Sequence, residues 1–186
     1  MITSILESLS PQGDKNFKLI LSFGEIDVRH LMYGTIIVNK YFKNPSQYMQ
    51  FVRPQLEKQI NTLKSLNTLV DIGILQPTPT TSTKSYGNPM STEELKDYYH
   101  KTSEHPVLGN PEFRAECWKE MCNFMEDFCY QNDLTYIQRC KESFTSSNLL
   151  NPKHTHDGCH LSSKAMLEFQ YSQLRDISKC QAIGTI

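Results

Sequence analysis

The chain has no excess of charge of either sign. Its 19 Lys and Arg residues stand against 20 Asp and Glu residues, which gives a formal net charge of −1. It therefore lacks the basic footprint typical of nucleic-acid-binding domains and of polybasic membrane anchors. No run of apolar residues approaches the length needed to span a bilayer. We expect no nucleic-acid partner and no membrane span.

The sequence also lacks the marks of a secreted protein. Residues 1–15 contain neither a positively charged start nor a small-residue cleavage site behind an apolar stretch. Six cysteines form no CxxC pair and are too few for a disulfide scaffold. Three of them, Cys117, Cys122 and Cys129, lie in one helical-looking segment, which is typical of free thiols packed as small apolar side chains. We predict a cytoplasmic protein.

Three apolar runs predict the strands of a sheet. Residues 17–23 and 68–75 are continuously apolar apart from a few positions, and 134–137 is a shorter run of the same kind. Continuous runs are typical of strands that are buried on both faces of a parallel sheet. Turn-forming residues follow each of the two longer runs.

Helices are expected between and after these strands. Residues 112–131 carry Met, Cys and aromatic side chains at steps of three and four, typical of a helix packed on a core. Asn44-Pro45-Ser46 marks a second helix start, and Pro54 either kinks that helix or opens another. Thr35–Val38 fits a strand or a helix equally well. Further helices are expected at 2–9, 91–100 and 163–177.

The order of these elements predicts the fold class. Strands and helices alternate, which favours βαβ units, a parallel sheet and right-handed crossovers within one α/β domain spanning 1–186. Residues 77–111 form a long connector rich in Thr, Ser, Pro and Gly, which we interpret as a substrate rim. Active sites of such folds lie beyond the carboxyl ends of the strands, here after Phe23, Leu75 and Ile137.

A cluster of ionisable residues follows the first strand. Glu25, Asp27, Arg29 and His30 fall within six positions, directly after Gly24. A glycine here would let the backbone approach a ligand closely, and an ion pair between Asp27 and Arg29 would fix the segment. A solvated loop without function is the alternative.

A second cluster precedes the expected last helix. Asp157 and His160 can share one tight turn, in which the carboxylate would hold the imidazole and leave its other nitrogen free as a general base. Such a pair also occurs for purely structural reasons. A different function is open as well, because His154, His156, Asp157 and His160 are four candidate zinc ligands within seven residues.

Both clusters carry a family resemblance. Residues 157–162, Asp-Gly-Cys-His-Leu-Ser, resemble the D-G-x-H-L-S block of the SGNH (GDSL-like) hydrolases. Residues 23–29 are similar to an F-G-E-I-D-x-R variant of the third block of that superfamily, and residues 75–79 resemble its proline-rich strand end. The resemblance covers about residues 17–177.

The resemblance implies a fold and a chemistry. The fold is a three-layer, flavodoxin-like α/β fold, and the reaction is acyl-ester hydrolysis or acyl transfer on a small ester or an acylated sugar, without a cofactor. It makes His160 the general base and Asp157 the carboxylate that orients it. Gly24 and its neighbours Glu25, Asp27 and Arg29 would line the oxyanion side of the site.

The sequence departs from this family in two places. The third block of the family usually carries an asparagine that binds the oxyanion. Ile26 stands at that position here, and its side chain donates no hydrogen bond. No G-D-S occurs: Gly13-Asp14 is followed by Lys15, and the residues before 17 are too few for another βαβ unit. Ser22 and Cys159 receive little support as substitute nucleophiles.

Three explanations of the missing serine remain open. The chain is the carboxyl-terminal part of a longer enzyme, or it is a relic without turnover that serves as an interaction domain. In the third, the fold is incomplete at its N-terminal side, and something covers the apolar edge of the 17–23 strand, because an exposed edge invites pairing. A second copy of the chain, residues 1–9 or residues 35–42 are the candidates for that cover.

Overall fold

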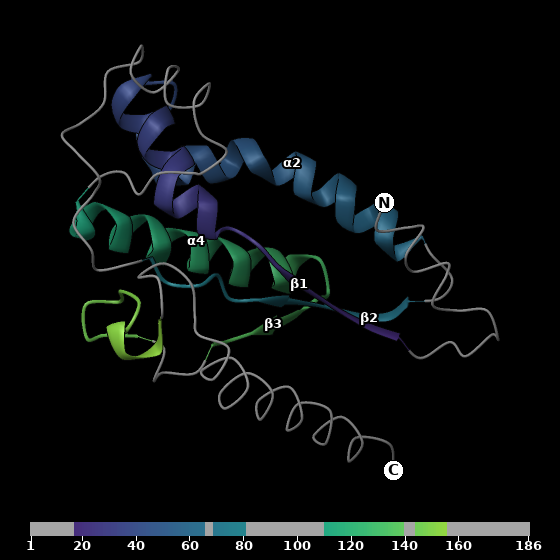
Figure 1. Cartoon of the computed structure of the whole chain (residues 1–186). Coiled ribbons are helices and arrows are strands. Elements are labelled where there is room, and N and C mark those ends of the chain that lie inside the picture. The colour runs from purple at the N-terminus through teal and green to yellow at the C-terminus, as the bar shows by residue number, and fades with distance from the viewer. Residues whose placement is uncertain (1–16, 66–68, 81–109, 140–143, 156–186) are drawn as a thin grey trace, which may run out of the picture.

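The computed structural model describes residues 17–65, 69–80, 110–139 and 144–155 (Figure 1). The helices predicted at 2–9, 91–100 and 163–177 lie outside these residues, as does most of the predicted rim connector. The described elements alternate between strand and helix along the chain, so the chain is a mixed α/β protein, as the sequence predicted.

The centre of the fold is a parallel sheet of three strands in the order β1-β2-β3. The strands are β1 (Phe17–Ser22), β2 (Leu69–Leu75) and β3 (Thr135–Ile137). All three predicted strands are confirmed. Residues 72–75 of β2 are buried on both faces, whereas residues 19–21 of β1 are only half-buried. This difference follows from position, because β2 is flanked by two strands and β1 pairs only with β2 among the described residues.

Two long helices connect the strands (Figure 1). Helix α2 (Pro45–Lys64) joins β1 to β2, and α4 (Pro111–Gln131) precedes β3. Each begins with an asparagine whose side chain accepts a hydrogen bond from a backbone N–H of the first turn, followed by a proline at the first helical position. That pairing suits a helix start, because proline lacks an N–H that would go unbonded there. Pro54 lies inside α2 and opens no second helix.

The ambiguous residues after β1 are helical. Two short helices of wide, π-type hydrogen bonding, η1 (Asp27–Leu31) and η2 (Tyr33–Val38), follow each other there. Their bonds run from each N–H to the fifth carbonyl before it, as from Met32 to Asp27 and from Asn39 to Gly34. Residues 35–38 therefore do not pair with β1 as a strand. This stretch does not cover the edge of β1 by adding a strand to the sheet.

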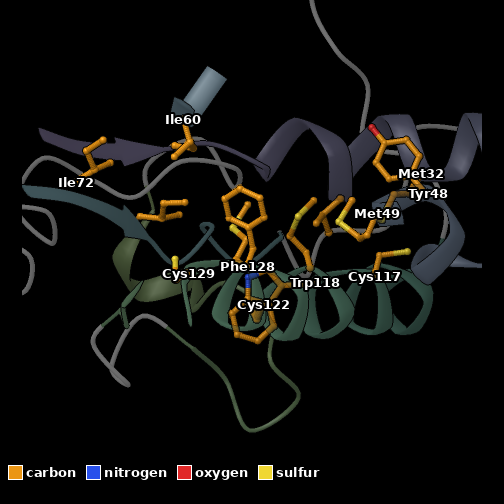
Figure 2. Close-up of a cluster of buried hydrophobic side chains, with 14 of the residues drawn as sticks. Met32, Tyr48, Met49, Ile60, Ile72, Cys117, Trp118, Cys122, Phe128 and Cys129 are labelled. Atoms are coloured by element: carbon orange, nitrogen blue, oxygen red, sulfur yellow. The ribbon is translucent and has the colours of Figure 1, made fainter. Parts of the chain in front are cut away.

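The core lies between the sheet and the two long helices. Ile72 and Ile74 project from one face of β2 into the same cluster as Ile60 of α2 and Phe128 of α4 (Figure 2). Both helices thus cover one face, as right-handed crossovers between successive strands require. Burying Phe128 alone contributes about 1.5–3 kcal/mol.

Sulfur-bearing side chains fill much of this core on the α4 side. Cys117, Cys122 and Cys129 are buried and free, which confirms the prediction for these three thiols. Burial raises the pKa of Cys117 and of Cys122 to about 12 and that of Cys129 to about 11. These thiols therefore stay protonated at neutral pH and pack as apolar groups.

Polar contacts hold α2 against α4. Arg53 donates to Asp127 at 2.8 Å and to Gln131 at 2.7 Å, and its guanidinium lies 5.1 Å from the ring centre of Phe124. None of the described helices is both long and apolar enough to cross a membrane.

Candidate functional site

The carboxyl ends of the three strands lie at one edge of the sheet. Ser22 is opposite Leu75, and Leu75 is opposite Ile137, so all three strands end at the same level. Side chains that follow these ends must share a small region, which is where α/β proteins place their ligands. The edge is therefore the candidate site.

Gly24 connects β1 to the helical segment that follows. Its φ of +95° is a conformation that other residues adopt only with strain. A Cβ at this position would lie 3.0 Å from Cε of Met125, so the glycine also allows close packing against α4. The close approach that we predicted for a ligand is thus made by a helix of the chain itself.

The predicted loop at 24–29 is the start of a helix. The first helical hydrogen bond runs from the Val28 N–H to the Gly24 carbonyl at 3.2 Å. The N–H groups of residues 26 and 27 are therefore among those that a helix start leaves without helical acceptors. His30, which we counted among the candidate polar residues, is fully buried.

The ionisable side chains of this segment pair differently from the prediction. Arg29 forms an ion pair with Glu25 at 2.8 Å, one helical turn earlier, rather than with Asp27. Asp27 instead accepts a hydrogen bond of 2.5 Å from the hydroxyl of Tyr48 in α2. The predicted pair is wrong because residues 27 and 29 point in different directions once the segment is helical. Burial, and then the Asp27 carboxylate, raise the pKa of Tyr48.

Arg139 ties the three strand ends together. It follows β3, is 6% exposed, and its Nε donates to the Gln76 carbonyl at 2.5 Å while Nη2 donates to Oγ of Ser22 at 3.3 Å. The backbone N–H of Arg139 also donates to the Gln76 side chain at 2.9 Å. Sequence reasoning missed this residue, although the rule of strand ends pointed to the position after Ile137.

The end of β2 is fixed by further hydrogen bonds. The Gln76 N–H donates to the Ile137 carbonyl at 2.8 Å, which continues the pairing with β3. The indole of Trp118 in α4 donates to the Pro77 carbonyl at 3.1 Å. Pro77 and Pro79 are buried. This strand end is therefore a rigid wall of the edge.

Two side chains at this edge bear on a hydrolase mechanism. Ile26 is 38% exposed, so the slot expected to donate to an oxyanion presents a carbon surface instead. Ser22 is exposed and accepts its hydrogen bond from Arg139. No described contact places a histidine beside the Ser22 hydroxyl.

The predicted acid–base pair, Asp157 and His160, lies outside the described residues, as do His156 and Cys159. Of the four candidate zinc ligands, only His154 is described, in the short helix η4 (Pro152–His154). Among the residues that the structure describes, no three His, Cys, Asp or Glu side chains are grouped to hold a metal ion. The meeting of residues 157–160 with residues 24–29 stays a prediction.

Comparison with known proteins adds no relative to this description. No family model matches the chain, and neither the curated proteins nor the solved structures contain one that is significantly similar to it.

Proposed function

We propose that the chain is a hydrolase domain of SGNH type. Its substrate is a small ester or an acylated sugar, and its reaction is acyl-ester hydrolysis or acyl transfer. One observation supports this most. The segment 24–29, which carries the resemblance, starts a helix at the carboxyl edge of a parallel sheet, where such folds place their chemistry. In this proposal the sheet is the flavodoxin-like centre of the fold.

Each predicted site residue has a role in the proposed reaction. His160 takes the proton from the attacking hydroxyl, and Asp157 holds its imidazole in the reactive orientation. In this proposal the serine that bears this hydroxyl belongs to a nucleophile segment that is absent from this sequence.

The oxyanion side falls to the helix start at residues 24–29. Because Arg29 is neutralised by Glu25, we assign oxyanion binding to the backbone N–H groups of residues 26 and 27 rather than to that guanidinium. Asp27 is held in place by Tyr48 and forms the wall beside them.

An ester assay tests the proposal. A short-chain chromogenic ester is offered to this chain and to a version extended upstream in the gene. We expect hydrolysis by the extended form, abolished in His160→Ala and retained in His154→Ala, a matched substitution in the same stretch. The proposal would be contradicted if neither form hydrolysed the ester, or if the His160→Ala variant were as active as the unsubstituted extended form.

An interaction domain without turnover is the second candidate. It is favoured by the exposed Ile26 at the expected oxyanion position and by the absence of any strand paired to the outer edge of β1 among the described residues. Zinc analysis after dialysis distinguishes a zinc site at residues 154–160 from the hydrolase proposal. Zinc that stays bound, and is lost in His154→Ala and in His156→Ala, would replace the hydrolase proposal.

A further inference from the structure

The guanidinium of Arg139 is a buried cation with neutral partners. Its hydrogen bonds reach a backbone carbonyl, at Gln76, and a hydroxyl, at Ser22. Within the described residues, no Asp or Glu forms an ion pair with it. Arg29 and Arg53, in contrast, each have a carboxylate partner.

Among the residues that the structure describes, Arg139 has no counter-charge, and since a buried charge without one is costly, we expect an anion beside it. Moving a charged group out of water carries a penalty that neutral hydrogen-bond acceptors offset only in part. Burial accordingly lowers the pKa of Arg139 to about 10, which still leaves the guanidinium charged at neutral pH. An anion beside it would supply the missing attraction.

Several donors of the Arg139 guanidinium are left unused by its contacts with the described residues. A guanidinium carries five N–H groups, and the side-chain contacts of Arg139 with described residues occupy Nε–H and one hydrogen of Nη2. No acceptor in the described part of the chain takes the hydrogens on Nη1 or the second one on Nη2, and a guanidinium fork can match two oxygens of a carboxylate or phosphate. Ser22 is exposed, and since its oxygen accepts from Arg139, its hydroxyl proton is available as a further donor.

We propose that the Arg139 guanidinium and the Ser22 hydroxyl bind an oxyanion, the carboxylate or phosphate-type group of a ligand, at the carboxyl edge of the sheet. The site lies two residues before Gly24, beside the proposed hydrolase centre, yet needs neither His160 nor a nucleophile. If both proposals hold, the substrate of the domain carries a negative charge.

Anion titration of the full chain tests this site. Sodium acetate and sodium phosphate are added separately at constant ionic strength, and the Tm and the NMR signal of the Arg139 Nε–H are followed. We expect saturable changes with at least one anion. A response to acetate alone identifies a carboxylate ligand, and a response to phosphate alone a phosphate ligand.

Variants show whether the response comes from this site. Ser22→Ala should weaken the apparent affinity by roughly tenfold, the loss of one hydrogen bond to a charged group. Arg139→Gln should remove the saturable response, whereas Arg53→Gln, whose guanidinium pairs with Asp127 between α2 and α4, should keep it. If Arg139→Gln does not fold, the proposal is tested by two other results. These are the weaker apparent affinity of Ser22→Ala and the movement of the wild-type Arg139 Nε–H signal on anion addition.

The proposal is overturned by either of two results. One is the absence of saturation with both anions, with the Nε–H signal unmoved. The other is a saturable response that Ser22→Ala and Arg139→Gln leave unchanged. No ester is present in these measurements, so their outcome is independent of whether the chain hydrolyses one.

Discussion

Replacing Gly24 by alanine should destabilise the fold by about 2 kcal/mol. The φ of +95° places an L-residue in a conformation that costs about 1–3 kcal/mol. The new Cβ also meets the methyl of Met125 at 3.0 Å, but this side chain is flexible and can yield by a few tenths of an ångström. A loss of about 2 kcal/mol lowers the folded-to-unfolded ratio roughly 30-fold.

Urea unfolding measured by tryptophan fluorescence gives this number directly. Trp118 is the chain's one tryptophan and is 6% exposed, so its emission reports the loss of the core. With a slope of about 2 kcal/mol per molar urea, the midpoint of Gly24→Ala should fall by about 1 M.

Gly34 provides the matched control. It lies within η2, and a Cβ there would meet no atom within 4 Å. Gly34→Ala should therefore raise stability by about 0.5–1 kcal/mol through the lower entropy of the unfolded chain. The reasoning is refuted if Gly24→Ala is as stable as the wild type, or if the two substitutions shift the midpoint in the same direction.

Three further predictions concern other contacts. Exchanging Arg53 for Gln should cost about 1 kcal/mol, and a double-mutant cycle with Asp127→Asn should show a coupling that shrinks in 1 M salt, because the pair is partly exposed; a salt-independent coupling would contradict this. Tyr48→Phe should cost about 1–3 kcal/mol in urea unfolding by removing the hydrogen bond to the Asp27 carboxylate, and the penalty should vanish in an Asp27→Ala background. Stability should fall as pH rises above 9, because unfolded thiols ionise near their ordinary pKa of 9.0 while the folded thiols of Cys117, Cys122 and Cys129 stay protonated up to about 11–12. The slope approaches about 1.4 kcal/mol per pH unit for each thiol, and circular dichroism should show it flattened in Cys129→Ala; an unchanged slope would refute this cause.

Local patterns predicted the elements whose signal does not depend on distant contacts. The apolar run at 17–23 and the stripe at 112–131 became β1 and α4 with ends shifted by a residue. Thr35–Val38 was ambiguous because its residues suit both a strand and a helix. Its helical state is accompanied by the buried packing of Tyr33 and Ile36, which no local pattern contains.

The candidate site shows the same division at the level of single side chains. The sequence pointed to residues 24–29 because charges follow a strand, but it predicted the wrong partner for Arg29, since the partner depends on helix geometry. Arg139 carried no motif. Its importance comes from contacts with Gln76 and Ser22, which are far from it in the sequence.

By itself, the sequence determined the α/β class, the parallel strands and the places where strands end. The apolar patterns of strands and helices alternate along the chain, and each pattern can be recognised within a short stretch. Only the tertiary structure decided which side chains meet at the carboxyl edge. The energy of such a contact depends on how deeply the two side chains are buried and on the distance between them. Because the partners lie more than sixty positions apart in the sequence, both are set only when the sheet forms.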